Sequence, residues 1–194
     1  LGEGRFSQVR AGRRLGAGTK VALKAMELQM LREDDEALEM LEAEVAALRL
    51  AARHPHLASS VVRLHEVIST RENIYLIMDR VPGEELFEVV DREGALAEPV
   101  VRRLLKQLIA ANLALHNVGI IHRDIKPENL IVSHLDNLSL TRLVLIDFGY
   151  AATNVRGKLT GLAGSPEYAA PEVLSWLEAD VSPGVLGEPY DAKC

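Results

Sequence analysis

The sequence predicts an α+β fold in two lobes, a β-rich N-lobe carrying one helix and a mainly helical C-lobe. Strand-like segments gather in residues 1–28 and 60–81, with one helical pattern between them. Beyond a Pro- and Gly-containing linker, the dominant pattern is helical. We therefore expect the N-lobe over residues 1–78, a hinge over 79–83 and the C-lobe over 84–194. A chain of 194 residues is long enough for two such lobes to bury a core.

Composition excludes several classes of protein. Hydrophobic residues make up 48% of the chain and charged residues 26%, as in ordinary globular proteins. The net charge of -6 and the lack of a basic stripe argue against nucleic acid or an anionic membrane as the main partner. No apolar run approaches the roughly 18 residues of a membrane span. The single cysteine, Cys194, excludes an intrachain disulfide and fits a reducing compartment, so we expect an intracellular, cytoplasmic protein.

The first nine residues, LGEGRFSQV, resemble a glycine loop of the form G-x-G-x-x-G, with Ser7 in place of the third glycine. Gly16 and Gly18 predict a turn between two strands, so a hairpin follows the loop. Dinucleotide-binding and Walker loops instead run into a helix, whose N-terminus binds phosphate. The hairpin therefore excludes both of these loop types.

An amphipathic helix is predicted over residues 33–53, ended by His54 and Pro55. Strands over 60–68 and 73–81 follow it, and then a short helix over 85–93. The predicted apolar stripe of the first helix consists of Leu38, Leu41, Val45, Leu48 and Ala52.

A second long helix is predicted to begin at Pro99 and to stop near Gly119. Short strands over 129–132 and 142–147 flank a polar loop, and a short helix is expected over 171–177. The side chains of the long helix that we expect to point inward are Val101, Leu104, Leu105, Leu108, Ala111 and Leu115.

Glu44 is unusual because it lies on the apolar side of its predicted helix. It is either a carboxylate at the helix edge that reaches solvent, or a buried carboxylate that needs a cationic partner. Alternation along the preceding strand puts Lys24 on one face with Ala22 and Met26. Lys24 is either an ordinary solvated lysine or a cleft residue that reaches both Glu44 and a phosphate.

Side chains that could take part in catalysis are densest in residues 120–130. The alternative interpretation of this stretch is an ordinary polar loop after a helix. Apolar segments on both sides fix this loop to the scaffold, and catalytic groups commonly lie on such loops. Asp147 likewise follows four apolar residues. Asn129 and Asp147 together offer oxygens suited to Mg²⁺, which prefers few protein ligands plus substrate phosphates. The polar residues of the dense stretch are His122, Arg123, Asp124, Lys126, Glu128 and Asn129.

In this order and context, the motifs resemble those of a eukaryotic-type protein kinase catalytic domain of the serine/threonine type. The resemblance runs through essentially all 194 residues and is greatest to the calcium/calmodulin-dependent group. It implies the bilobal protein-kinase fold, with a C-lobe that is incomplete here. The motifs are GEGRFSQV, VALK, Glu44 in a helix, HRDIKPEN, DFG and APE.

The resemblance also implies a role for each matching residue, with ATP and Mg²⁺ as cofactors and proteins with Ser or Thr as substrates. The glycine loop, with Gly2, Glu3, Gly4 and Val9, covers the phosphates. Lys24 holds the α- and β-phosphates and is positioned by Glu44, while Asp147 and Asn129 bind Mg²⁺. Asp124 accepts or orients the proton of the substrate hydroxyl, and Lys126 stabilises the transferred phosphoryl group.

For the nucleoside, the resemblance implies that Val9, Ala22 and Ile131 sandwich the adenine. Met78 is the gatekeeper, Asp79 to Val81 form the hinge that bonds the adenine edge, Glu85 contacts the ribose, and Glu128 joins the nucleotide-binding set. Leu48, Leu64, His122 and Phe148 match the hydrophobic spine of an active kinase. Lys126 and Ser165 favour serine/threonine over tyrosine substrates.

Ser7 departs from the family pattern but is tolerated in active kinases. The chain starts inside the glycine loop and stops where the last C-lobe helices would begin, so we expect a domain cut at both ends, poorly soluble or weakly active alone. Thr160, in the activation segment (residues 147–172), is either a phosphosite paired with Arg123 or an ordinary loop residue. The alternatives to a protein kinase are a pseudokinase that binds nucleotide or acts as a scaffold, and a small-molecule phosphotransferase. A regulatory partner is not identifiable from the sequence.

Overall fold

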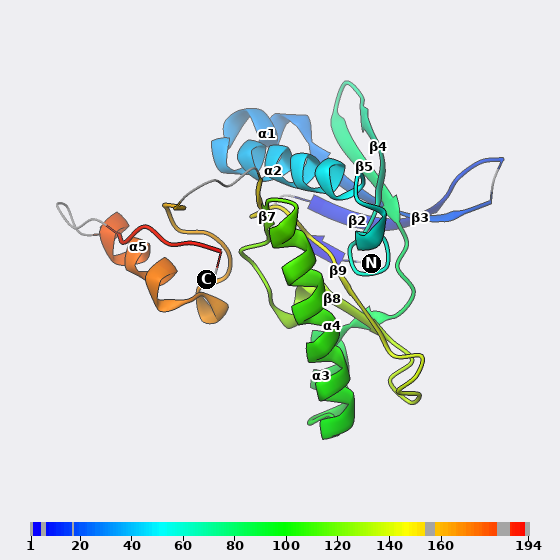
Figure 1. Cartoon of the computed structure of the whole chain (residues 1–194). Helices are drawn as coiled ribbons and strands as arrows, with labels where there is room; N and C mark the ends of the chain where they lie inside the picture. Colours follow the sequence, from blue (N-terminus) through cyan, green and yellow to red (C-terminus); the bar gives the residue numbers. More distant parts are fainter. Residues whose placement is uncertain (1, 5–6, 17, 154–157, 182–186, 193–194) are drawn as a thin grey trace.

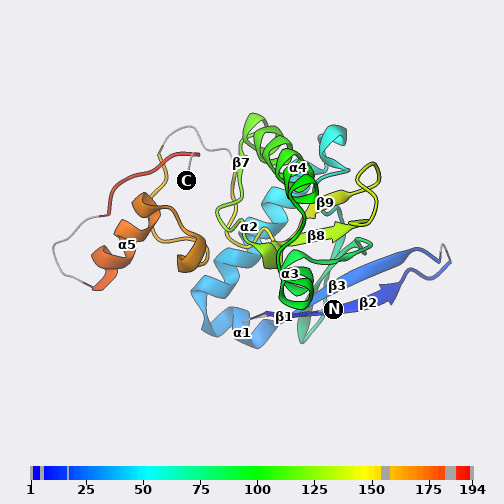
Figure 2. The same cartoon turned by 90° about the horizontal axis from the view of Figure 1, so that it is seen from below.

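The computed structural model describes residues 2–4, 7–16, 18–153, 158–181 and 187–192. Cys194, and Arg5 and Phe6 of the glycine loop, lie outside these ranges. The fold is α+β, as predicted, with an antiparallel sheet and a helix pair preceding a mainly helical part. Figure 1 and Figure 2 both show α5 set apart from the sheet, α2 and α4.

The N-lobe sheet has five antiparallel strands in the order β1-β2-β3-β5-β4. The predicted hairpin is confirmed, since β2 and β3 pair from Gln8 with Ala25 to Arg13 with Lys20. Alternation predicted that Ala22, Lys24 and Met26 share a face of β3, and all three side chains are buried. The strands are β1 (Gly2–Gly4), β2 (Ser7–Arg13), β3 (Lys20–Glu27), β4 (Leu64–Ser69) and β5 (Asn73–Asp79).

The helix predicted over residues 33–53 is α2 (Asp35–Ala51), and a short helix that was not predicted, α1 (Leu28–Glu33), precedes it. Asp34 separates them because its backbone is extended, with φ -131°, while its side chain accepts a bond from the Ala37 amide at 3.1 Å. The sequence pattern predicts strand for residues up to 28 and does not indicate α1.

The buried face of α2 also differs from the predicted stripe. Leu38 is 39% exposed and Ala52 is exposed, so both assignments were wrong. The face toward the core is centred between Leu41 and Glu44, which turns Leu38 to its edge; Ala52 lies past the helix end. The buried residues of α2 are Ala37, Leu41, Glu44, Ala47, Leu48 and Ala51.

The C-terminal part contains the predicted helices, and α4 carries a proline in its first turn as expected. Of its predicted inward residues, Val101 is 37% exposed and Leu105 50% exposed, which corrects those two assignments. The elements are β6 (Glu84–Glu85), α3 (Leu86–Glu93), α4 (Glu98–Asn117), β7 (Ile120–Ile121), β8 (Leu130–Ser133), β9 (Arg142–Leu145), β10 (Ala152–Thr153) and α5 (Pro171–Val181).

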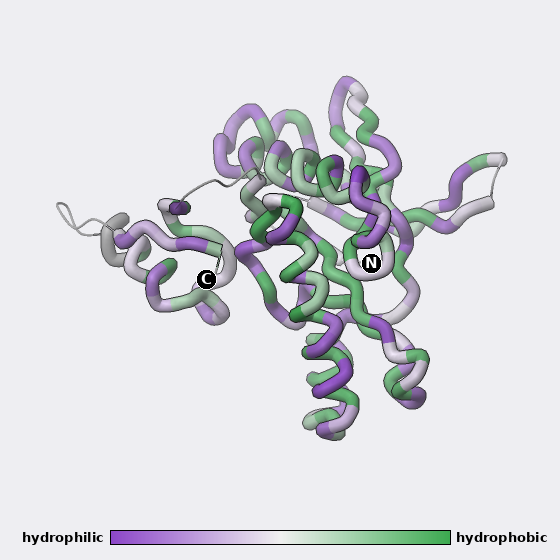
Figure 3. The backbone as a smooth tube through the Cα atoms, in the orientation of Figure 1, coloured by the Kyte–Doolittle hydropathy of each residue, from purple (hydrophilic) through white to green (hydrophobic). Residues whose placement is uncertain are grey.

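A continuous apolar core joins α2, β4 and β5 to α4, β8 and β9. Figure 2 shows α2 and α4 on neighbouring sides of β8 and β9, and Figure 3 shows hydrophobic and hydrophilic residues alternating along α4. Small sheets in the order β6-β8-β9 and β10-β7 hold the loops between these elements. Within the described ranges, no helix combines the length and apolarity needed to cross a bilayer.

Candidate active site

Lys24 lies at the junction of β3, α2 and the segment after β9. Its Nζ is 2.7 Å from Glu44 Oε2 and 3.2 Å from Asp147 Oδ1. Lys24 is 7% exposed and Glu44 2% exposed, so Glu44 is the buried, paired carboxylate and not a solvated edge residue. The Asp147 side chain is 43% exposed, which leaves the cluster open on that side.

Charge pairing sets the protonation of this cluster. Burial alone would lower the pKa of Lys24, but Glu44 and Asp147 outweigh it and raise that pKa. Burial raises the pKa of Glu44, opposed by the Lys24 charge. For Asp147, the Lys24 charge and the Gly149 amide overcome the effect of burial and lower the pKa. Lys24 and Asp147 are therefore charged at neutral pH.

The predicted catalytic loop (residues 122–129), called the catalytic loop below, buries Asp124, which is 7% exposed. Asp124 Oδ1 accepts a bond from the Ser165 amide at 2.9 Å, and Oδ2 accepts one from Asn129 Nδ2 at 2.9 Å. Lys126 Nζ is 3.2 Å from Asp124 Oδ2 and donates to Ser165 Oγ at 2.6 Å. The structure thus brings the predicted base, lysine and amide together, with Ser165 against them.

Two residues of the site have left-handed backbone: Arg123 with φ 63° and Asp147 with φ 56°. Such conformations are unfavourable for residues with a Cβ and concentrate at functional sites. His122, 1% exposed, stacks edge-on against Phe148 at 4.6 Å between ring centroids. This contact fixes the catalytic loop to the segment that carries Asp147.

Asn129 and Asp147 could supply metal ligands. The bonds that hold Asn129 use its amide nitrogen, donated to the carbonyl and carboxylate of Asp124, and leave its side-chain oxygen available. Asp147 uses Oδ1 to accept from Lys24 and Gly149. Among the described residues, no group of three or more His, Cys, Asp or Glu could hold a metal. The amide oxygen of Asn129 and the carboxylate of Asp147 are of the type that Mg²⁺ takes as ligands when phosphates complete its shell.

The predicted nucleoside residues lie on paired strands. Val9 pairs with Lys24, and Ala22 with Met78, across the sheet. Ile131 pairs with Glu85 between β8 and β6.

The remaining nucleotide-site predictions lie around these strands. Asp79 and Val81 are half-buried at the end of β5 and just after it, and Glu128 Oε2 is buried with no hydrogen-bond partner among described atoms. A Cβ on Gly2 would lie 4.0 Å from Glu85 Oε1, so β1 reaches the ribose-contact candidate. Glu3 and Gly4 are placed only as strand backbone.

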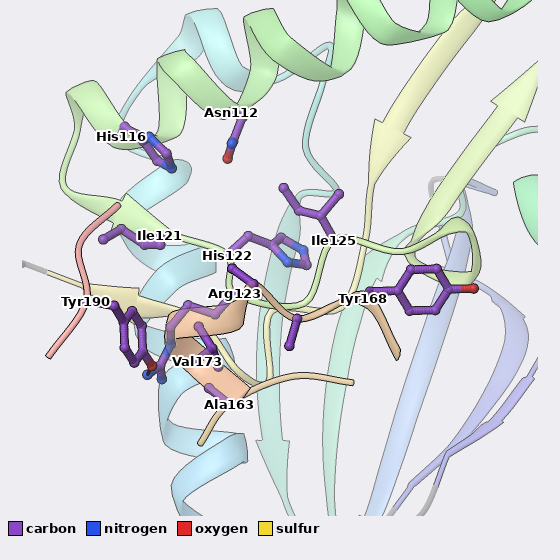
Figure 4. A pocket seen from close by; sticks show the side chains of 12 residues that line it. Asn112, His116, Ile121, His122, Arg123, Ile125, Ala163, Tyr168, Val173 and Tyr190 are labelled. Carbon is purple, nitrogen blue, oxygen red and sulfur yellow. Dashed lines mark hydrogen bonds between the residues drawn. The ribbon is translucent and has the colours of Figure 1, made fainter. Parts of the chain in front are cut away.

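Sequence reasoning missed Gly164 and Tyr190. Gly164 has φ +80°, and a Cβ there would lie 2.2 Å from the Arg123 carbonyl oxygen, so only glycine fits between activation segment and catalytic loop. Its position before Ser165-Pro166 was the available signal. Tyr190 carried no recognisable signal. It lines a pocket with Asn112 and His116 of α4 behind the catalytic loop; Lys24 and Asp147 do not line it (Figure 4).

Comparison with known proteins decides the family. The family model described as protein kinase domain matches residues 1–185. The chain belongs to the protein kinase family. The resemblance found in the sequence is thereby confirmed, and so is the kinase fold class.

The kinase is 38% identical over 184 residues to CBL-interacting protein kinase 15 of Oryza sativa subsp. japonica, and the matched region covers 93% of this chain and 40% of that relative. It is 40% identical over 180 residues to CBL-interacting protein kinase 20 of the same plant, a match that covers 90% of this chain and 38% of the relative. It is 38% identical over 185 residues to CBL-interacting serine/threonine-protein kinase 16 of Arabidopsis thaliana, a match that covers 90% of this chain and 37% of the relative. These relatives fall in the CaMK-related group, as predicted. The chain spans about 40% of the length of the curated relatives it matches.

Proposed function

We propose that the full-length protein is a serine/threonine protein kinase that transfers the γ-phosphoryl group of Mg-ATP to protein hydroxyls. One observation carries this proposal: the Lys24 ammonium lies 2.7 Å from Glu44 and 3.2 Å from Asp147 at the open edge of the site. Glu44 fixes the lysine in place, and Asp147 puts a cation-binding carboxylate beside it. The membership of the family and the serine/threonine names of relatives support the same activity.

The proposed mechanism relies on positioning and charge, because phosphoryl transfer needs little covalent help from the protein. Lys24 binds the α- and β-phosphates. Asn129 and Asp147 would hold Mg²⁺, which would neutralise phosphate charge when bound. Asp124 orients the substrate hydroxyl and accepts its proton through a carboxylate that the Ser165 amide and Asn129 keep in place. Lys126, 3.2 Å from that carboxylate, stabilises charge on the transferred group.

We further propose that Val9, Ala22 and Ile131 enclose the adenine beside the Met78 gatekeeper. The glycine loop, with Gly2, Glu3 and Gly4, would close over the phosphates. The hinge residues Asp79 and Val81 would bond the adenine edge, while Glu85 and Glu128 would complete the ribose side. The unpartnered Glu128 Oε2 supports this, since a bound ligand would supply the missing donor.

The cytoplasmic location stays a prediction from cysteine usage.

The decisive experiment replaces Asp147 with Asn in the full-length protein. We expect loss of Mg-ATP-dependent phosphorylation of a generic Ser/Thr peptide by about 10²-fold or more, because the cation loses its charged ligand. Asp136→Asn, in the exposed turn after β8, is the matched control and should keep wild-type turnover. Phosphoamino-acid analysis of the product should find phosphoserine or phosphothreonine.

Unchanged turnover in Asp147→Asn would contradict the proposal. Nucleotide-dependent melting without any phosphoryl transfer by the wild type would instead support the pseudokinase alternative.

A further inference from the structure

Tyr190 lies in the last described segment, residues 187–192, and is only 3% exposed. The segment is fixed to α5, since Trp176 Nε1 donates to the Glu188 carbonyl at 2.8 Å and the Glu188 amide donates to Ser175 Oγ at 3.0 Å. A Cβ on Gly187 would lie 2.3 Å from the Trp176 ring, so the two are in close contact. Figure 1 shows this segment running beside α5. Tyr190 is therefore anchored before it reaches the activation segment.

Tyr190 holds the activation segment on both sides of Thr160. Its backbone exchanges two hydrogen bonds with Leu159, at 2.7 and 3.0 Å. Its hydroxyl donates to the Gly161 carbonyl at 3.0 Å. Gly164 and Ser165, which touch the catalytic loop, follow three and four residues after Gly161. The position of Tyr190 thus affects the segment that contacts Asp124.

The Tyr190 hydroxyl also meets Arg123, the residue before Asp124. Arg123 Nη1 donates to the hydroxyl at 3.4 Å, and Arg123 Nε donates to the Tyr150 carbonyl at 2.6 Å. Figure 4 shows the tyrosine ring and the arginine side chain side by side at the pocket wall. The hydroxyl therefore accepts from the catalytic loop and donates to the activation segment, which joins the two.

We propose that Tyr190 is a positioning residue whose hydroxyl ties the activation segment to Arg123 and so stabilises the arrangement of Asp124 and Ser165 without a phosphate on the segment. Its effect on turnover rests on the proposed kinase function; its effect on segment order does not. The tie uses the arginine that a phosphate on Thr160 would also need. In this arrangement the tyrosine holds the arginine.

The test is Tyr190→Phe in the full-length protein, which removes the hydroxyl and keeps the ring that lines the pocket. We expect amide hydrogen exchange of residues 158–165 to speed up by about 5-fold or more, and kcat to fall about 3- to 20-fold, as for loss of one or two hydrogen bonds. The KM for ATP should stay unchanged, because Lys24 and Glu44 are untouched. Tyr75→Phe, on β5 of the N-lobe, is the matched control and should alter neither readout.

A second variant, Arg123→Lys, separates positioning from simple stability. Lysine lacks the planar fork that reaches Tyr150 and Tyr190 together. If the hydroxyl acts through Arg123, the two substitutions should be non-additive in kcat, with the double variant close to the worse single variant. Unchanged exchange in Tyr190→Phe, or a lower melting temperature with unchanged kcat, would overturn the inference. If the wild-type protein transfers no phosphoryl group and Tyr190→Phe still speeds amide exchange, the tie is upheld and the proposed function is contradicted instead.

Discussion

Lys24 depends on its surroundings for its role. A buried ion pair is weak evidence of stability, because desolvation offsets much of the attraction. Here Lys24 also contacts the more exposed Asp147, so its charge faces an opening as well as its buried partner. That geometry suits a lysine held ready for an anion better than one that serves only the core.

Replacing Glu44 with Gln tests this arrangement. We expect the free energy of unfolding to fall by about 1–3 kcal/mol, because the amide keeps a hydrogen bond but leaves the Lys24 charge less compensated. The KM for ATP should rise as Lys24 loses its fixed position. Urea unfolding and steady-state kinetics measure both effects.

Glu42→Gln is the matched control, since Glu42 lies two residues earlier on α2 and is exposed. Equal stability of the Glu44 and Glu42 variants would show that the buried pair does not hold Lys24.

The connection between β5 and β6 shows how elements are placed by one residue. Gly83 has φ +129°, and a Cβ there would lie 2.2 Å from the Val132 carbonyl oxygen of β8. The chain passes so close to β8 that a side chain has no room. The path of the predicted hinge therefore requires glycine at position 83. A sequence pattern cannot show this requirement, because it arises from the close approach of β8.

We predict that Gly83→Ala loses more than the cost of backbone strain alone. Gly94→Ala is the control, because Gly94 also has positive φ, +75°, but a Cβ there would have nothing within 4 Å. We expect the control to lose about 1–2 kcal/mol of unfolding free energy and Gly83→Ala at least about 1 kcal/mol more. Chemical denaturation provides the comparison. Equal losses would mean that the β5–β6 connection shifts freely.

At the scale of the whole molecule, one exposed apolar feature is a stripe on α4 that points away from the core. Val101, Leu105, Ile109 and Leu113 follow at intervals of four residues and are 37%, 50%, 58% and 58% exposed. Four such residues on one helix face form a contiguous patch, and such patches favour association.

The predicted consequence is self-association of residues 1–194. Replacing Leu105, Ile109 and Leu113 with Gln should lower the association constant about tenfold or more, because burying one such side chain is worth about 1.5–3 kcal/mol. Sedimentation velocity measures this constant. A control that replaces the exposed Arg102, Arg103 and Lys106 with Gln should associate no less than the wild type. A monomeric wild type would contradict the prediction.

The sequence predicted what local pattern and motif order determine. Most strands and helices followed from alternation and periodicity, because those repeat along the chain. The same patterns left Lys24 and Glu44 each either solvated or paired, and the resemblance to the family favoured the pair. The break at Asp34 and the orientation of Leu38 did not follow from these patterns, since both depend on how α2 seats on the sheet. Tyr190 was invisible for the same reason: its partners lie 29 and 67 residues away. The roles assigned to the site residues stay predictions until the variants are measured.

The left-handed backbone of Arg123 and Asp147 opposes the presence of side chains at both positions. Each conformation costs about 1–2 kcal/mol for a residue with a Cβ. Glycine at position 147 would relieve that cost and abolish the charge that faces Lys24. If the proposed function is correct, a change from Asp147 to glycine therefore relieves backbone strain but removes a residue that the function needs, so that selection for stability and selection for activity oppose each other at this position.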